Sequence, residues 1–438
     1  MLRKCMLFGS VIIMSAVLFG CNCSGMKHLC KESYEPTYVQ FGNMSSAERL
    51  KTAEEKRGLY YANRLDTFMK DEDYKKGGTV FIGDSITQRF PIKEAFEGKN
   101  VINRGIGGDR IMGVAERLDV CIKDLEPSKI YLMIGINDIN WAFSSIEDLA
   151  KQYNILLKDL QYTAPKADIT VFSVLPMTHK FAVKNNLVLE LNEKIITLVK
   201  KYNMKYFDLY PFFADKNGEL RESLTTEGLH LSKEGYLTWL YAILDKDEFY
   251  ETAVNLSGLW MENKISVFEV TKIDPPSEGE YPGNRGANEL IIYTPKYKKP
   301  TTGTNAWGTE AIVRNGIVEK VYKSNSPIPP DGYVVSGHGL AEQWILQGLK
   351  PGVLVEYDSK SISFTDSAGT EGTPGVQLKH LKKKLFEKLI KIKESGTDKQ
   401  NEDLAKCILM KIQELEIADS LSMSDVDYLS QKLSDLKL

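Results

Sequence analysis

The stretch that decides the fold is TVFIGDSIT, residues 79–87. Its first four residues are β-branched or aromatic, which is typical of a short buried strand, and Gly83 lets the backbone turn sharply after it. Open α/β sheets hold their reacting groups just past the carboxyl ends of their strands. Ser85 is therefore a candidate nucleophile, although Gly-Asp-Ser is also a common composition of a plain turn.

Two later segments have the same form, a short apolar run followed by small or polar residues. In NRGIGGD, residues 103–109, Gly107 and Gly108 expose backbone N–H groups without a Cβ in the way, as an oxyanion hole requires. The apolar strand 130–134 is followed by Asn137, whose side-chain N–H groups lie at the same edge of the sheet. Each segment alone also fits a structural role, as a glycine turn or a strand terminator.

A histidine completes the set of candidate residues. In EGLH, residues 227–230, Glu227 stands three residues before His230. This spacing is close enough for the carboxylate to hold the imidazole tautomer that can accept a proton from a serine. Taken alone, His230 would be an ordinary loop histidine.

In this order and spacing, the four segments resemble the motif blocks of the SGNH/GDSL hydrolase family, and the resemblance covers about residues 75–245. It implies a flavodoxin-like three-layer α/β/α domain, with Ser85 as nucleophile and His230 as general base. It also implies an oxyanion hole formed by the backbone N–H groups of Ser85 and Gly108 and by the side chain of Asn137.

The resemblance departs from the family pattern at one position. The family usually has aspartate three residues before its histidine, where this chain has Glu227. Glutamate is longer by one methylene group, so it orients an imidazole differently. Glu227 is the candidate third member of the triad, and a backbone carbonyl or another acid such as Asp208 is the alternative.

Short apolar strands alternate with helical stretches through this region, for example the helix expected at residues 187–203. Such alternation predicts a parallel sheet with helices on both faces. The chain of 438 residues is long enough for about two or three domains. A formal net charge of −3 supplies no electrostatic reason to expect a nucleic-acid partner.

The N-terminus predicts export. Arg3 and Lys4 precede an apolar stretch, residues 6–19, that is short for a transmembrane helix but right for the core of a signal peptide. The following LFGC, residues 18–21, resembles a bacterial lipobox, which implies cleavage after residue 20 and lipidation of Cys21. We therefore expect a signal peptide at residues 1–20, a tether at residues 21–44 and a lipoprotein anchored to the membrane or cell envelope. An ordinary secretory signal or a buried helix is the alternative.

The remaining cysteines do not indicate a metal site, because no CxxC pair and no histidine at ligand spacing accompanies them. A disulfide between Cys23 and Cys30 is an option in an oxidising compartment. Cys121 and Cys407 are interpreted as buried small apolar residues. No cofactor or metal is expected for ester chemistry.

A helix is predicted just before the catalytic segments. Ser45 is a plausible N-cap with Glu48 in the first turn, and apolar residues follow at helical spacing up to residue 70, interrupted by Gly58. The aromatic residues of this stretch could line a sugar-binding cleft, but packing into the core is the favoured interpretation. The hydrolase domain is thus expected to span residues 45–250.

Residues 255–370 have a different texture, with β-rich runs at 265–270, 289–294 and 310–313 between Pro and Gly turns. Asn315-Gly316 predicts a hairpin, because it tolerates the positive φ values of a type I′ turn. Phrases such as 302–308 and 336–339 are loosely similar to β modules beside phosphodiester-glycosidase and glycoside-hydrolase-like domains. His338 is interpreted as a loop residue rather than part of a second site.

The last segment, residues 376–438, is predicted to be helical from apolar residues at three- and four-residue steps. Lys382, Lys383 and Lys384 are interpreted as a solvated face, with contact to anionic lipid as the alternative.

Together these features predict an exported serine esterase that removes O-acetyl or similar small acyl groups, with acylated carbohydrate as the expected substrate. A lipid or lysophospholipid acylhydrolase would use the same chemistry. A catalytically impaired surface protein that binds glycans is the alternative from a different class.

Overall fold

In the computed structural model, the chain divides into residues 1–35 and a compact unit from Pro36 to Leu438. The structure describes residues 34–41, 44–71, 75–141, 144–225, 228–261, 270–273, 289–293, 309–314, 317–323, 330–337, 354–357, 361–365, 374–395, 399–418 and 421–436. Cys21, Cys23, Cys30, Glu227 and His338 lie outside these ranges, so the predictions made for them remain predictions.

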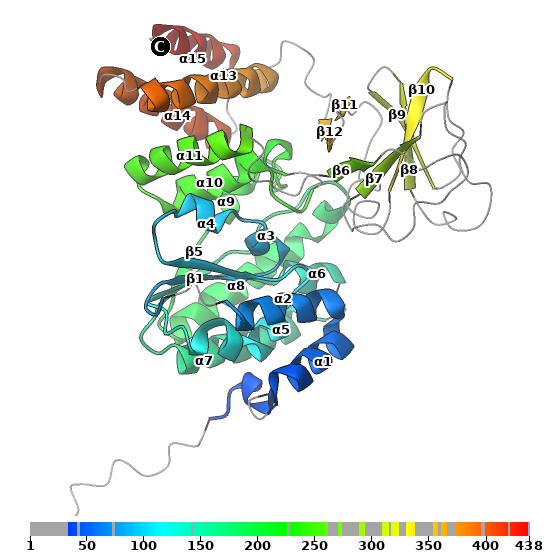
Figure 1. Ribbon diagram of the computed structural model, residues 1–438, viewed down its shortest axis with the longest axis vertical. Helices are drawn as coiled ribbons and strands as arrows, with labels where there is room; N and C mark the ends of the chain where they lie inside the picture. The colour runs from blue at the N-terminus through cyan, green and yellow to red at the C-terminus, as the bar shows by residue number, and fades with distance from the viewer. Residues whose placement is uncertain are drawn as a thin grey trace, which may run out of the picture. The chain divides into compact units, whose positions relative to one another are not determined.

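A five-stranded parallel sheet forms the centre of the hydrolase domain (Figure 1). Its strands lie in the order β2-β1-β3-β4-β5, which is the order of the flavodoxin-like domain that the resemblance implies. The strand bounds are β1 (Thr79–Gly83), β2 (Val101–Gly105), β3 (Lys129–Met133), β4 (Asp168–Phe172) and β5 (Lys205–Phe207).

Helices cover both faces of this sheet, with α2, α5 and α7 on one face and α4, α10 and α11 on the other (Figure 1). α8 packs against α7. The predicted three-layer α/β/α architecture is therefore confirmed. The helix bounds are α1 (Ser46–Arg57), α2 (Leu59–Met69), α3 (Ser85–Gln88), α4 (Ile92–Ala95), α5 (Ile111–Glu116), α6 (Ile136–Trp141), α7 (Ile146–Thr163), α8 (Asn185–Lys201), α9 (Tyr210–Phe213), α10 (Lys233–Ile243) and α11 (Lys246–Met261).

The strands are apolar on both sides because both faces of the sheet are covered. Phe81 of β1 packs edge-on against Phe90 and contacts Tyr131 of β3, with ring centroids 5.7 and 4.7 Å apart. Trp239 of α10 packs edge-on against Phe172 of β4. These aromatic rings form part of the apolar core between the sheet and α10.

The tether predicted for residues 21–44 is wrong for its last part. Residues Thr37–Phe41 form a 3₁₀ helix, η1, in which Tyr38 and Phe41 are buried. The Thr37 backbone N–H donates to Asp159 of α7 at 3.1 Å. Two aromatic side chains within five residues give this segment enough apolar surface to pack onto the domain. The prediction of a tether did not take this apolar surface into account.

The helix predicted after this segment is present as two helices. Ser45 and Glu48 form a capping box at the start of α1, and Gly58, with φ of +88°, separates α1 from α2. Tyr61 is buried as expected, but Tyr60 is 54% exposed. The packing interpretation therefore holds for part of the aromatic set only.

The β-rich segment forms a closed barrel in the described residues, in the order β10-β7-β6-β12-β11-β9-β8. Arg314 and Ile317 pair across the predicted two-residue hairpin. α11 continues to Met261 and so runs through the domain boundary predicted at residues 250–255. The strand bounds are β6 (Val270–Ile273), β7 (Glu289–Tyr293), β8 (Thr309–Arg314), β9 (Ile317–Lys323), β10 (Gly332–Gly337), β11 (Leu354–Tyr357) and β12 (Ser361–Thr365).

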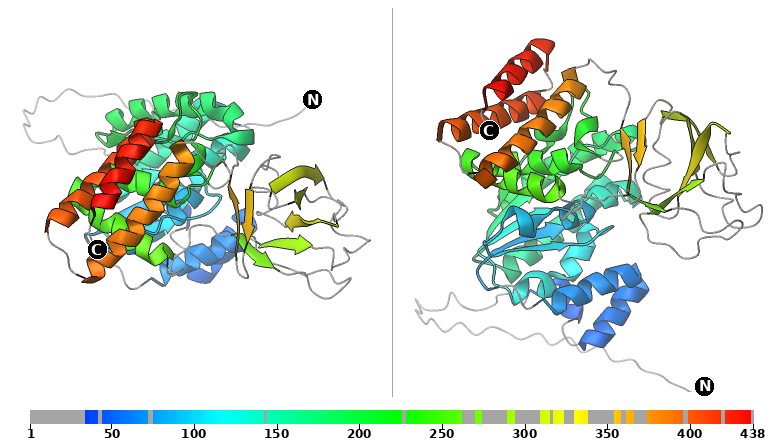
Figure 2. Two further views of the ribbon diagram at one scale, coloured as in Figure 1. Left: turned by 90° about the horizontal axis from the view of Figure 1, so that it is seen from above. Right: turned by 45° about the horizontal axis from the view of Figure 1, so that its top comes forward.

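Three C-terminal helices confirm the predicted helical segment: α13 (Pro374–Ser395), α14 (Lys399–Ala418) and α15 (Met423–Asp435). They lie side by side, coloured orange to red in Figure 2, and α13 and α14 pack against α11. Arg221 of the hydrolase domain donates to the backbone oxygen of Glu416 in α14. The barrel is thus inserted in the sequence between two helices, α11 and α13, that pack against each other.

Two side-chain predictions in this region are wrong. Lys382 is buried rather than solvated, because its Nζ pairs with Glu416 at 2.8 Å, whereas Lys383 and Lys384 are exposed. Cys407 is exposed and Cys121 is buried, so the buried-thiol interpretation holds only for Cys121. None of the described helices is long and apolar enough to cross a membrane.

Candidate active site

The candidate nucleophile sits on a tight turn between β1 and α3. The Asp84 side chain caps α3 by accepting a hydrogen bond from the Ile86 backbone N–H at 2.9 Å. A Cβ on Gly83 would lie 2.2 Å from the Thr87 hydroxyl and 2.4 Å from the Met133 carbonyl oxygen. Only glycine fits there, so Gly83 permits the close approach that puts Ser85 at the first position of the helix.

The structure brings Ser85 and His230 together from 145 residues apart, with Oγ and Nε2 separated by 2.8 Å. Both residues are buried, with Ser85 5% exposed and His230 1% exposed. Thr225 holds the histidine loop, because its hydroxyl donates to the His230 backbone oxygen at 2.7 Å and accepts from the Gly228 N–H at 2.8 Å. This is the geometry of a serine paired with its base.

The two adjacent glycines have different surroundings. The Gly107 N–H is engaged with the Gln88 side-chain oxygen at 2.6 Å. Gly108 is exposed, has φ of +76°, and would have open space around a Cβ. A non-glycine residue at this position would be strained by its backbone conformation rather than by crowding. Of the two, Gly108 is the one that faces solvent and can meet a ligand.

Asn137 lies in the first turn of α6 and is 4% exposed. Its Nδ2 donates to the Asp109 backbone oxygen at 2.9 Å. This bond defines which end of the amide carries the donors, since a carbonyl oxygen can only accept. One N–H of Asn137 is thereby used, and the second is left for a ligand at the carboxyl edge of the sheet.

Asp208 is not the partner of the histidine. It is exposed, and its Oδ1 accepts a hydrogen bond from the Tyr210 backbone N–H at 3.1 Å, as a turn residue does. That alternative for the third triad member is therefore removed. Glu227 and a backbone carbonyl stay open.

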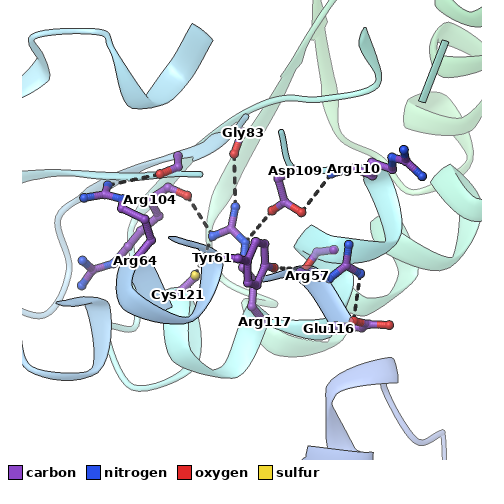
Figure 3. Close-up of polar contacts among 12 residues, drawn as sticks. Arg57, Tyr61, Arg64, Gly83, Arg104, Asp109, Arg110, Glu116, Arg117 and Cys121 are labelled. Carbon is purple, nitrogen blue, oxygen red and sulfur yellow. Dashed lines mark hydrogen bonds and ion pairs between the residues drawn. The ribbon is translucent and has the colours of Figure 1, made fainter. Parts of the chain in front are cut away.

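Sequence reasoning missed a buried ion pair behind the site (Figure 3). Arg117 and Asp109 are each 1% exposed, with Arg117 Nε and Asp109 Oδ2 2.8 Å apart. A signal was available: Arg117 falls three residues after Val114 and four before Cys121, both fully buried, so a charge stands at helical spacing between apolar residues. A charge at such a position needs partners inside the protein.

Two further carboxyls beside the site have altered acidity. Burial raises the pKa of Asp84 from 3.8 to about 7 against the hydrogen bond from Ile86, and Asp109 adds to the rise. Burial likewise raises the pKa of Asp138 to about 7, against a backbone hydrogen bond from Ile111. Both groups are therefore poised to change charge near neutral pH.

These two carboxyls predict a pH-dependent stability. A group whose pKa is higher in the folded chain contributes stability at low pH, and that contribution is lost as pH rises through about 7. We expect the free energy of unfolding to fall between pH 5 and pH 8 by about 2 kcal/mol per group. Asp138→Asn keeps an acceptor for Ile111 and should remove the share of Asp138 in this decline, leaving that of Asp84, in denaturant titrations at several pH values. Asp124→Asn, on the surface, is the matched control; an equal decline in wild type and Asp138→Asn would contradict the prediction.

Among the described residues, no group of three or more His, Cys, Asp and Glu side chains could hold a metal ion. The described part of the candidate site holds a serine, a histidine, an exposed glycine backbone and an amide side chain.

A five-stranded parallel sheet between helices, with a serine and a histidine in hydrogen-bond contact at its carboxyl edge, defines an SGNH-type α/β hydrolase domain. Residues 81–237 match the model of the GDSL-like lipase/acylhydrolase family. This domain belongs to that family, which confirms the resemblance seen in the sequence.

Solved structures similar to this chain include three bacterial proteins. A protein from Streptococcus pneumonia provisionally assigned as a platelet activating factor is 25% identical, with 47% of this chain and 100% of that chain covered and a TM-score of 0.41. A GDSL-like lipase from Bacteroides thetaiotaomicron is 22% identical, with 45% and 98% covered and a TM-score of 0.37. An acetylxylan esterase from Geobacillus stearothermophilus is 17% identical, with 40% and 95% covered and a TM-score of 0.33. No curated protein matches the chain.

Proposed function

We propose that the protein is a serine esterase that removes small acyl groups, O-acetyl above all, from carbohydrate. The observation that carries this proposal is the 2.8 Å contact between Ser85 Oγ and His230 Nε2. The buried Asn137 follows β3, the strand that pairs with the β1 strand before Ser85. A nucleophile, its base and a donor for the oxyanion at one sheet edge are the parts that acyl transfer needs.

The reaction would proceed through an acyl-enzyme. Ser85 Oγ attacks the ester carbonyl carbon while its proton passes to His230 Nε2. The carbonyl oxygen becomes negative and is stabilised by N–H groups of Ser85, Gly108 and Asn137. The C–O bond to the alcohol then breaks, and the alcohol leaves with the proton from His230. Water repeats these steps with His230 as base, which releases the carboxylic acid and restores Ser85.

One feature at the edge of the site supports a sugar rather than an acyl chain as the larger part of the substrate. The hydroxyl of Tyr60 donates to Gln88 at 2.8 Å and would lie 3.4 Å from a Cβ on Gly107. Its ring is thus anchored beside the oxyanion loop and half-exposed. A tyrosine ring with its hydroxyl is suited to a partner that has both an apolar face and hydrated polar groups, as a sugar ring has.

A panel of esters tests the proposal. Purified residues 22–438 are assayed with p-nitrophenyl acetate, butyrate and octanoate and with acetylated xylo-oligosaccharides. Turnover that falls with chain length and occurs on the acetylated sugars is expected. Preference for octanoate would replace the proposal with a lipid acylhydrolase, and glycan binding without any turnover would replace it with a binding protein.

We also propose that Glu227 orients His230, since it occupies the position of the family's usual acid. Glu227→Gln should then lower kcat/KM by about 10-fold or more, because loss of the carboxylate weakens the charged imidazolium while the Ser85–His230 pair persists. Glu227→Asp should keep or improve activity. Wild-type kcat/KM in both variants would leave a dyad supported by a backbone carbonyl.

The protein is further proposed to be an exported lipoprotein, because residues 18–21 resemble a lipobox after an apolar segment of signal-peptide length. Cys21→Ser should move the protein from the membrane fraction to the soluble exported fraction in a bacterial host. Cys23→Ser is the matched control and should stay with the membrane. Membrane association of Cys21→Ser equal to that of wild type would contradict the prediction.

A further inference from the structure

The buried Arg117 connects three parts of the site (Figure 3). Its Nε donates to Asp109 Oδ2 at 2.8 Å, in the loop that follows β2. Its Nη2 donates to the Gly83 backbone oxygen at 3.2 Å, at the end of β1 and two residues before Ser85. Its Nη1 donates to the Arg104 backbone oxygen at 2.8 Å. One guanidinium therefore joins the nucleophile turn to the strand and loop that carry Gly108.

Asp109 transmits this connection to Asn137. Its backbone oxygen is the acceptor that orients the Asn137 amide, and its carboxylate is held by Arg117 on one oxygen and by the Arg110 N–H at 2.9 Å on the other. A Cβ on Gly113 would lie only 1.8 Å from Asp109 Oδ1. The helix α5 thus leaves a space that the carboxylate of Asp109 fills.

The chemistry of the contacts requires arginine. Burial works against the charged form of Arg117, but Cys121, whose sulfur accepts from Nη1 at 2.9 Å, and the Asp109 carboxylate raise the pKa of the guanidinium. A planar group with five donors can serve acceptors in several directions at once, whereas a lysine ammonium is a single point charge with three donors.

We propose that Arg117 is a positioning residue for the proposed esterase reaction: through Asp109 it orients the Asn137 amide toward the oxyanion, and through Gly83 it keeps the nucleophile turn in register with that amide. This role rests on the proposed function. A residue that only stabilised the core would affect folding, whereas this role of Arg117 affects the transition state through the Asn137 amide.

The first test replaces the planar guanidinium of Arg117 by an ammonium group and keeps the positive charge. Arg117→Lys should lower kcat for p-nitrophenyl acetate by about 10- to 100-fold with KM within about 2-fold of wild type, since the oxyanion donor is used mainly in the transition state. Arg49→Lys is the matched control. Arg49 is also buried, at 8% exposed, but pairs through its side chain with Asp119, so its kcat should stay near wild type. Thermal unfolding of both variants reports any loss of fold.

The second test is a double-mutant cycle, which distinguishes an effect of Arg117 through Asn137 from an independent effect on the stability of the core. If Arg117 acts through Asn137, adding Arg117→Lys to Asn137→Ala should cost less than about 3-fold in kcat. Multiplicative losses in the double variant would overturn the proposal, as would wild-type kcat in Arg117→Lys. If Arg117→Lys does not fold, Asp109→Asn, which keeps the backbone acceptor and weakens the ion pair, enters the same cycle. A wild-type protein without esterase activity would overturn the proposed function and this role with it, whereas an active wild type with additive variants overturns only this role.

Discussion

Ser85→Ala is expected to abolish ester hydrolysis, with kcat for p-nitrophenyl acetate reduced by on the order of 10⁴-fold or more. The alanine removes the oxygen that attacks the carbonyl in the proposed reaction and that His230 Nε2 contacts at 2.8 Å. His230→Ala should produce a loss of similar size, because a serine hydroxyl is a weak nucleophile at neutral pH without a base.

Because the two residues act as a unit, the double variant should be no slower than either single variant by more than a few-fold. Ser223→Ala, an exposed serine near the start of the histidine loop, is the matched control and should retain wild-type kcat. Circular dichroism and thermal unfolding establish that the variants are folded. Substantial turnover by folded Ser85→Ala would remove Ser85 from the reaction.

Asn137→Ala is expected to give the second largest loss, on the order of 10²- to 10³-fold in kcat with little change in KM. The Asn137 amide is buried and held by the Asp109 carbonyl, so its remaining N–H is already oriented before substrate binds. A donor that strengthens its bond only as negative charge develops contributes to kcat rather than to binding.

The matched control is Asn154→Ala on α7, whose side-chain oxygen accepts from Lys201 and Tyr202 on the domain surface. Its kinetic constants should equal those of wild type. A variant of Asn137 that raises KM and leaves kcat unchanged would make Asn137 a substrate-binding residue instead.

The strand and turn chemistry of the hydrolase domain could be predicted from local patterns. Thr79–Gly83 is a β-branched and aromatic run closed by a glycine, and such a run forms the same strand in most surroundings that bury it. Ser85, Gly108 and Asn137 each follow a predicted strand and were expected to lie together, because parallel strands bring their carboxyl ends to one edge. His230 follows no such strand, and only the family resemblance assigned it to the same site.

Side chains whose environment depends on distant partners could not be predicted in this way. Lys382 looked like part of a solvated charged face, yet Glu416, 34 residues later, buries it in an ion pair. Cys407 looked apolar and buried, yet it lies on the outer side of α14. The segment at Tyr38 and Phe41 looked like a tether because its partners, such as Asp159, lie more than a hundred residues away.

The sequence by itself indicated the class of this protein, since four short motifs, three of them just after β1, β2 and β3, resemble those of the GDSL-like hydrolases. Only the tertiary structure decided how those groups are held. Arg117 and Asp109, eight residues apart in the sequence, form an ion pair. The fold adds a bond from Arg117 to the Gly83 backbone oxygen, 34 residues earlier, and a bond from Asn137 to the backbone oxygen of Asp109, 28 residues earlier. A buried charge is stabilised by whichever acceptors the fold brings to it, and two of those of Arg117, the Gly83 and Arg104 carbonyl oxygens, are backbone atoms, which carry no signature in the sequence.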